Sequence, residues 1–491
     1  MAKSFKVLFV SSEVYPFAKE SGIADVSHSL PLAIRELQHD IRVICPKYGV
    51  LNERRSKIHN VSRLRDVEIA VGDKTELANI KSATIISKKN KVQVYFSSNQ
   101  DYFEQRKGIY HDPINWSAYP DNAERFIFFA KSALETCVRL KWIPDIIHCN
   151  DWQTALIPAF MKNNYAGKFN KTKVVFTIHN FYRQGVFPLE ELLKTELSNE
   201  LKEVFIHKDM MNFLKGGLEL SNYITTVSPS YANELLDDTT YGNELNYVLK
   251  SKVGYFKGIL NGIDDYIWNP RRDKLIHQKL EDDFDDFKIS NKVFLQRQFG
   301  LPVAPEKPLL GFIPRIGYQK GVSLLIETAE KILNNDLQIL LLGQGDNELK
   351  IQLAEIEKKY PEKFKAVFAF DEDLSHQIEA GADFLMLPSM YEPCGLNVMY
   401  SMKYGTIPIV RHTGGMKDST ENYNDATQTG NSIVFTNYDK KDFSDAISRA
   451  VNLYSNKTDF KRIIRNALDK DFSWSGGAKE YDNIYRTIMK E

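Results

Sequence analysis

Short runs of apolar residues recur along the chain, and longer amphipathic segments separate them. Most runs are apolar at consecutive positions, which is typical of strands whose two faces are both covered by helices. In the first half they predict strands at 6–10, 41–45, 92–96, 145–149, 173–178 and 223–227. In the second half they predict strands at 309–314, 337–342, 366–370, 384–387, 407–410 and 432–435. This alternation of strand and helix predicts a doubly wound α/β fold.

The number of predicted strands indicates more than one domain. One doubly wound domain rarely needs so many, so we expect two Rossmann-like domains. The segment 258–264, with two glycines and an Asn-Gly pair, is typical of a connection between them. Alternating residues at 67–71 and 83–86 indicate a small antiparallel insertion. Ligands of open α/β sheets bind beyond the carboxyl ends of the strands, so two domains facing a central cleft would share one ligand.

Charge and composition exclude several classes of function. The 64 Lys and Arg residues balance the 64 Asp and Glu residues, whereas a general nucleic-acid or anionic-membrane binder shows a basic excess. No apolar run approaches the roughly 18 residues of a membrane span. Cys45, Cys137, Cys149 and Cys394 lack CxxC spacing and indicate reduced, buried thiols of a cytoplasmic protein. We expect neither a nucleic acid nor a membrane as partner.

Two segments that follow strands carry cations suited to phosphate. Lys19 and Gly22 precede an apolar helical pattern, where a glycine lets phosphate approach a helix N-terminus. The segment is not GxGxxG, so the nicotinamide fingerprint is absent. Arg315 and Lys320 follow the strand at 309–314 and could converge on one diphosphate. The interaction of one such cation with one phosphate charge is worth roughly 4 kcal/mol at about 4 Å and an effective dielectric near 20. Alternatively, Arg315 and Lys320 are ordinary charged residues of an exposed loop and only increase solubility.

Two further loops suit sugar and phosphate binding. Glu392 follows the strand at 384–387 and could accept hydrogen bonds from sugar hydroxyls. Gly395 could expose backbone N–H groups at a helix start, although a simple turn is the alternative. Gly414 and Gly415 follow the strand at 407–410 and form a second candidate phosphate cradle.

The acidic triplet at 371–373 has two interpretations. It could be a metal-binding DxD of nucleotide-sugar enzymes, or it could open the helical pattern at 375–380 with Asp373 as the cap. Arg315 and Lys320 would make a metal redundant, so we favour the helix start. We expect no metal and no cofactor.

Taken together, the motifs resemble the bacterial glycogen synthase and plant starch synthase family, which are retaining glucosyltransferases of the GT-B fold. The resemblance runs in register over nearly the whole chain. The matching segments are 19–26, 121–126, 148–154, 176–180, 184–187, 225–229, 258–264, 315–321, 392–397, 413–415 and 471–474. Each motif is modest alone, and their order along the chain carries the resemblance.

The chain departs from the family pattern at two places, and at a third it differs from related GT-B families. The usual Lys-Thr-Gly-Gly-Leu is Lys-Glu-Ser-Gly-Ile at 19–23, so Ser21 replaces a glycine and would narrow the backbone conformations beside the phosphate. The frequent His-Asp-Trp-His is Asn-Asp-Trp-Gln at 150–153. Related GT-B families carry a second glutamate eight residues after the one that corresponds to Glu392. This chain has Tyr400 at that position, which resembles glycogen synthases in particular.

The resemblance implies a role for each matching residue. The implied catalytic residues are Glu392, His179, Arg315 and Lys320. The two cations would bind the diphosphate, and Glu392 would hold sugar hydroxyls. The implied substrate-binding residues are Lys19, Gly22, Asp25, Asp151, Asn261, Cys394, Gly395, Leu396, Thr413 and Gly414. His148, in contrast, is expected to be a packed strand-end histidine.

The resemblance also implies domains and an activity. Residues 1–257 would form the acceptor side, residues 258–474 the nucleotide-sugar donor side, and the last helix, 475–491, would return to the first domain. The activity would be glucosyl transfer from ADP-glucose to the non-reducing end of an α-1,4-glucan, with retention of the anomeric configuration. UDP-glucose as donor, another acceptor, or a non-catalytic glucan-binding protein are the alternatives.

Overall fold

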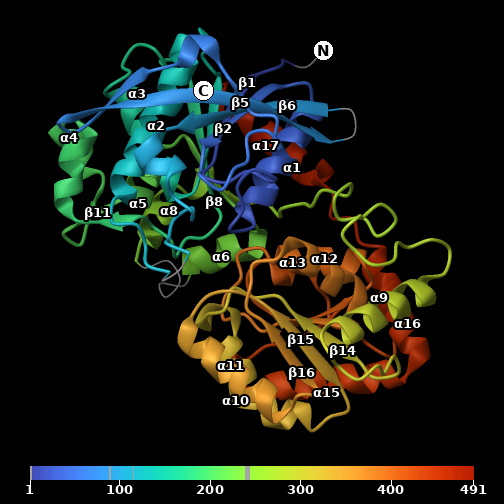
Figure 1. The fold of residues 1–491 in the computed structure, drawn as a ribbon. Helices are drawn as coiled ribbons and strands as arrows, with labels where there is room; N and C mark the ends of the chain where they lie inside the picture. Colours follow the sequence, from blue (N-terminus) through green and yellow to red (C-terminus); the bar gives the residue numbers. More distant parts are fainter. Residues whose placement is uncertain (1–2, 88–89, 114–115, 238–243, 491) are drawn as a thin grey trace. The chain divides into compact units, whose positions relative to one another are not determined.

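The computed structural model describes residues 3–87, 90–113, 116–237 and 244–490 (Figure 1). The chain divides into two compact units, residues 1–262 with 474–491 and residues 263–473. Each unit contains an open, mostly parallel sheet, which confirms the α/β class with two doubly wound domains. No helix in the described ranges is long and apolar enough to cross a membrane. The acceptor-side and donor-side roles of the two domains stay predictions.

The first unit is built on a sheet whose strands run in the order β13-β12-β8-β7-β1-β2-β6 and then continue into β5 and β3. All pairs from β13 to β6 are parallel. Their bounds are β1 Lys6–Val10, β2 Asp40–Pro46, β6 Asn90–Ser98, β7 Ile146–Asn150, β8 Lys173–Ile178, β12 Tyr223–Thr226 and β13 Phe256–Gly258. The six strands expected in this half are confirmed. The strand order reverses beside β1, which places a topological switch point between β1 and β7.

An antiparallel extension continues this sheet, as the alternating residues predicted. Strand β5 pairs antiparallel with β4 and with β6, because each hairpin reverses the chain. A separate small sheet has the order β10-β11-β9. The bounds are β3 His59–Asn60, β4 Val67–Val71, β5 Lys74–Ser87, β9 Val186–Phe187, β10 Ile206–His207 and β11 Met210–Asn212.

The second unit has an all-parallel sheet in the order β16-β15-β14-β17-β18-β19. Numbered within the unit this order is 3-2-1-4-5-6, the arrangement of dinucleotide-binding sheets, with its switch point between β14 and β17. The bounds are β14 Leu309–Phe312, β15 Gln338–Leu342, β16 Phe364–Val367, β17 Phe384–Leu387, β18 Ile407–Arg411 and β19 Ile433–Phe435. The six strands expected here are confirmed, with ends shifted by up to three residues.

Amphipathic helices connect the strands in both units (Figure 1). In the first unit they are α1 Ile23–Glu36, α2 Asn122–Arg139, α3 Ile157–Lys162, α4 Asn199–Glu203, α5 Phe213–Leu220, α6 Pro229–Asp237, α8 Asn246–Ser251 and α17 Trp474–Ile488. In the second they are α9 Phe284–Gln298, α10 Val322–Leu333, α11 Asn347–Lys359, α12 Glu372–Gly381, α13 Leu396–Lys403, α14 Met416–Ser419, α15 Lys440–Ser455 and α16 Lys457–Leu468.

The last helix of the chain belongs to the first unit. Helix α17 packs against α1, and the Trp474 indole donates a hydrogen bond of 2.7 Å to the Ser29 hydroxyl of α1. The Tyr485 hydroxyl lies 2.7 Å from Nδ1 of His148, whose Nε2 lies 2.6 Å from the Thr177 hydroxyl. His148 is fully buried by these contacts, as expected for a packed histidine at a strand.

The acidic triplet opens helix α12, but the cap differs from the expected residue. Asp371, not Asp373, is the N-cap, and its carboxylate accepts the Leu374 N–H at 2.9 Å. Glu372 and Asp373 lie in the first turn, where their negative charges interact favourably with the helix dipole and stabilise the helix. The cap lies two residues earlier because a side chain at that position reaches the N–H three residues on.

Candidate active site

The predicted site residues of the first unit follow neighbouring strands at one edge of its sheet. Lys19 lies in the loop after β1, Asp151 directly after β7, and His179 directly after β8. Asn261 lies three residues after β13. All four strands are parallel, so these loops share the carboxyl edge, and the first two flank the switch point. The structure therefore brings them to the part of the sheet where ligands bind.

Asp151 organises the loop after β8. Its backbone has φ of 55°, a left-handed conformation that is rare for a residue with a side chain. Its buried carboxylate accepts the backbone N–H of His179 at 2.6 Å and that of Asn180 at 3.4 Å. Burial raises the pKa of Asp151 to about 7, although the two N–H donors lower it. Strain and a buried carboxyl in one residue are features that cluster at functional sites.

His179 is held as a neutral ring with a defined tautomer. Its Nε2 lies 2.9 Å from the side-chain oxygen of Asn150, whose amide nitrogen donates to the Val10 carbonyl at 2.9 Å. Nε2 therefore donates, and Nδ1 is left as an acceptor. Burial lowers the pKa of His179 to about 3. At neutral pH the ring carries no charge and can orient a polar group without repelling a cation.

The loop after β1 is anchored by Glu13, a residue that sequence analysis missed. The Glu13 carboxylate accepts the backbone N–H of Glu20 at 2.6 Å, that of Ser21 at 2.8 Å, and the Ser21 hydroxyl at 3.0 Å. The Tyr110 hydroxyl donates to it at 2.8 Å. Burial, and next the charge of Glu20, raise the pKa of Glu13 to about 7. A carboxylate three residues beyond a buried strand was the available signal.

The contacts of Ser21 show how the loop accommodates a residue larger than glycine. Ser21 is not among the described residues with positive φ, so its backbone conformation does not require glycine. Its hydroxyl adds a hydrogen bond to Glu13. The narrower range of backbone conformations beside the phosphate stays a prediction. Gly22 is the N-cap of α1 with φ of −63°, so its backbone conformation does not require glycine either. What Gly22 contributes is the absence of a side chain at the start of a 14-residue helix.

Lys19 and Asp25 form an ion pair at the start of α1. Lys19 Nζ lies 3.0 Å from Asp25 Oδ1, and both side chains are mostly buried. Asn261 is also buried, and within the described residues its side-chain oxygen has no hydrogen-bond partner. A buried acceptor of this kind is suited to a ligand hydroxyl.

In the second unit the predicted site residues follow β14, β17 and β18. Arg315 and Lys320 follow β14, Glu392 follows β17, and Thr413 follows β18. These strands are neighbours in the sheet, and the first two form its switch point. Arg315 is half-buried beside Ile316, which forms a bridge with Gly345. The convergence of Arg315 and Lys320 on one diphosphate stays a prediction.

The structure pairs Lys320 with Glu392 across 72 residues of sequence. Lys320 Nζ lies 2.6 Å from Glu392 Oε2, which also accepts the Ser389 hydroxyl at 3.1 Å. Glu392 is buried and Lys320 partly so. The cation expected at the phosphate and the carboxylate expected at the sugar therefore contact one another. Ser389, the third member, was missed because a lone serine in a loop carries no distinctive pattern.

Backbone contacts hold the three loops of the second unit together. The Gly415 N–H donates to the Glu392 carbonyl at 3.0 Å, which joins the loops after β17 and β18. Gly321, before α10, has φ of 75°, and a Cβ there would lie 2.1 Å from the Pro388 carbonyl oxygen. Gly395, the N-cap of α13, has φ of 81°. Glycine is required at both positions, and a helix begins directly after Gly395, as the sequence predicted.

The remaining predicted residues lie in the same loops. Cys394 and Thr413 are buried, Gly414 has φ of 48°, and Leu396 is the first residue of α13. Arg411, which was not singled out, donates a hydrogen bond to the Met390 carbonyl and thereby ties β18 to the loop after β17.

Comparisons with known proteins agree with this architecture. The family model of the starch synthase catalytic domain matches residues 6–251, and that of group 1 glycosyl transferases matches residues 296–467. Curated glycogen synthases of Chlorobaculum parvum and Desulforudis audaxviator are 36% identical over 490 residues and 38% identical over 504 residues. These alignments cover 99% and 100% of this chain, and 99% and 97% of the relatives.

Solved structures give the same result. The catalytic domain of starch synthase IV from Arabidopsis thaliana, bound to ADP and acarbose, superposes with a TM-score of 0.91 at 31% identity and full coverage of both chains. Sucrose-phosphate synthase from Thermosynechococcus elongatus shares the fold, with a TM-score of 0.60 at 14% identity and 99% coverage of each chain. Sequence, fold and loop placement thus agree, and the chain belongs to the glycogen synthase and starch synthase family of glycosyltransferases.

Proposed function

We propose that this protein elongates an α-1,4-glucan by transferring glucose from ADP-glucose to its non-reducing end, with retention of the anomeric configuration. The observation that carries the proposal is the full-length match to glycogen synthases together with Arg315, Lys320 and Glu392 at the second switch point. ADP in the structure of the starch synthase IV relative supports the choice of donor. The four cysteines are buried and form no disulfide within the described part of the chain, which supports a cytoplasmic location.

The cations of the second unit supply the main chemical contribution in this proposal. Negative charge develops on the leaving diphosphate as the glycosidic bond breaks through an oxocarbenium-like state. Arg315 and Lys320 stabilise that charge, and the N-terminus of α13 adds partial positive charge from its backbone N–H groups. Lys320 must then exchange part of its contact with Glu392 for a phosphate oxygen. That exchange leaves Glu392 available to accept a sugar hydroxyl.

The residues of the first unit position the reacting sugar in this proposal. Neutral His179 and the unpartnered oxygen of Asn261 offer acceptors for glucosyl hydroxyls. No carboxylate of the predicted set is an obvious nucleophile, so we favour attack on the same face of the sugar as the leaving group. The diphosphate then accepts the proton of the attacking hydroxyl, which balances the step without a separate base.

One assay tests the proposal directly. Purified protein is supplied with glycogen and either ADP-glucose or UDP-glucose, and incorporation of labelled glucose is measured for both donors. Faster incorporation from ADP-glucose supports the proposal. Preference for UDP-glucose overturns the donor assignment alone. Absence of transfer from both donors, in protein that still binds glycogen, favours the non-catalytic glucan-binding alternative.

A further inference from the structure

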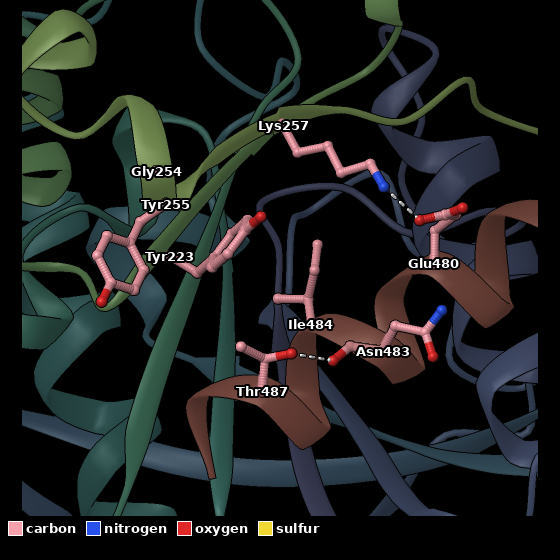
Figure 2. Close-up of a pocket in the computed structure, with 8 residues that line it drawn as sticks. All are labelled: Tyr223, Gly254, Tyr255, Lys257, Glu480, Asn483, Ile484 and Thr487. Atoms are coloured by element: carbon pink, nitrogen blue, oxygen red, sulfur yellow. Dashed lines mark hydrogen bonds and ion pairs between the residues drawn. The ribbon is translucent and has the colours of Figure 1, made fainter. Parts of the chain in front are cut away.

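A pocket of about 440 Å³ lies in the first unit, between the start of strands β12 and β13 and one face of helix α17 (Figure 2). Tyr223 is the first residue of β12, and Tyr255 precedes β13 by one residue. Asn483 and Thr487 face them from α17. The volume falls within the range of about 300–1,000 Å³ that is typical of small-ligand pockets.

This pocket is separate from the candidate active site. Strands β12 and β13 are parallel, and the predicted site residues lie beyond their carboxyl ends, as Asn261 does. Tyr223 and Tyr255 lie at the amino ends of the same strands. A strand of four residues separates the two edges by about 13 Å, at a rise of about 3.3 Å per residue. The pocket therefore lies at the opposite edge of the sheet, and the proposed transfer reaction does not use it.

Two tyrosine rings form one wall of the pocket. Their centroids are 6.1 Å apart and their planes make an angle of 81°, so they form a corner (Figure 2). The Tyr255 side chain is 44% exposed, which leaves ring surface in contact with solvent. Opposite them, Ile484 is buried at the base of the α17 side. Aromatic rings that combine an apolar face with a polar hydroxyl bind ligands that have both kinds of surface.

The charges of the pocket cancel. Lys257 Nζ lies 2.5 Å from Glu480 Oε2, and this is the only ionic pair among the residues that line it. A phosphate or carboxylate ligand would have to displace Glu480 from Lys257 and would then lie beside the Glu480 carboxylate, which repels it. A neutral ligand rich in hydroxyl groups needs no displacement. It can use the carboxylate, the ammonium group and the Asn483 amide as hydrogen-bond partners.

We propose that this pocket is a second carbohydrate-binding site, which holds a segment of neutral α-glucan away from the active site. The polar groups of the pocket match sugar hydroxyls, and the tyrosine rings match the apolar C–H face of a pyranose. This inference rests on the proposed function for the identity of the sugar. A polymeric acceptor held at a second site stays near the enzyme between transfers, which raises the local concentration of chain ends.

The first experiment compares two exposed tyrosines in the full-length protein. Tyr255→Ala removes one ring of the pocket, whereas Tyr247→Ala removes a tyrosine of similar exposure, 48%, that does not line it. Binding to glycogen is measured by native electrophoresis in gels that contain the polymer. We expect Tyr255→Ala to weaken glycogen binding roughly threefold to tenfold and Tyr247→Ala to leave it unchanged. Equal mobility of wild type and both variants would overturn the proposal.

A second variant fills the pocket instead of removing a wall. A Cβ placed on Gly254, which lines the pocket, has no atom within 4 Å, so Gly254→Leu adds volume without a clash. Its thermal midpoint should match that of wild type while glycogen binding falls as in Tyr255→Ala. Undiminished binding by a folded Gly254→Leu variant would contradict the proposal even if Tyr255→Ala weakened binding through a fault in folding.

Kinetics separate this site from the active site. With maltotriose as acceptor, kcat and KM of the two pocket variants should equal those of wild type, and with glycogen only KM should rise. Loss of kcat with maltotriose would show that the pocket variants damage the active site, and it would overturn the second site. If the protein transfers glucose from neither nucleotide donor, the electrophoresis still tests the pocket. Weakened binding of ADP by Tyr255→Ala, with glycogen binding unchanged, would identify a nucleotide pocket instead.

Discussion

At the residue scale, the central contact is the ion pair between Lys320 and Glu392. Replacing Arg315 or Lys320 with alanine removes one cation from the proposed diphosphate site. We expect each variant to lower kcat by about 10²–10³, because loss of one group that stabilises developing charge costs several kcal/mol of transition-state stabilisation. Lys331→Ala, which removes a 60% exposed lysine of the same unit, is the control and should retain full activity. Near-normal turnover in folded Arg315 and Lys320 variants would refute the phosphate assignment.

Ser21 carries a second prediction at this scale. Ser21→Ala removes the hydroxyl bond to Glu13 and keeps the backbone N–H bond, so the loop after β1 loses one of its anchors. A hydrogen bond contributes about 0.5–1.5 kcal/mol, so kcat/KM for the nucleotide donor should fall roughly twofold to tenfold. The fall should be larger at pH 8 than at pH 6, because Glu13 has a pKa of about 7 and is the stronger acceptor when ionised. Ser21→Thr keeps a hydroxyl and should restore activity; equal activity of the alanine and threonine variants would refute this role.

At the scale of elements, His148 fastens helix α17 to strand β8 through Tyr485 and Thr177. Burial lowers the pKa of His148 to about 3, so the folded protein resists a proton that the unfolded chain accepts near pH 6.5. This contribution to stability is fully present above pH 6.5 and is lost as the pH falls toward 3. The free energy of unfolding of wild type should fall when the pH is lowered from 6.5 to 5. In His148→Gln this fall should be smaller by about 2 kcal/mol, because the variant lacks the buried histidine.

The measurement for this prediction is chemical denaturation at the two pH values. His59→Gln, at an exposed histidine of β3, is the control and should follow wild type. If the free energy of unfolding falls equally in wild type and His148→Gln between the two pH values, protonation of the buried histidine does not contribute to the pH dependence of stability.

At the scale of the whole molecule, positive charge for the leaving group comes from the chain's own side chains in the proposed mechanism. Arg315 and Lys320 supply it, and the carboxylate of Asp371 is engaged as the cap of α12. Glucosyl transfer should therefore persist after dialysis against a strong chelator. Rates with and without chelator, and after addition of magnesium or manganese, provide the measurement. Complete loss of transfer that either metal restores would replace the cationic mechanism with a metal-dependent one.

The sequence alone determined the fold class, most of the strands and the loops in which the candidate site residues lie. Strands β1, β8 and β17 have the predicted bounds, because continuous apolar runs reflect burial on both faces. The candidate site residues could be proposed from the sequence because strand ends, glycine positions and short motifs are local features of the chain, and their roles stay predictions. The three-residue strand β13 was missed, since Phe-Lys-Gly has no apolar run and pairs only because β12 lies beside it.

Only the tertiary structure decided which residues meet. Lys320 and Glu392 are 72 residues apart, and their contact depends on β14 and β17 being neighbours at a switch point. Glu13 anchors the loop seven and eight residues further on, and its raised pKa arises from burial, which no local pattern encodes. The pocket of Tyr255 likewise exists only because α17, more than 200 residues later, packs beside the first unit's sheet. Contacts between distant segments depend on strand order, and strand order is a property of the folded chain.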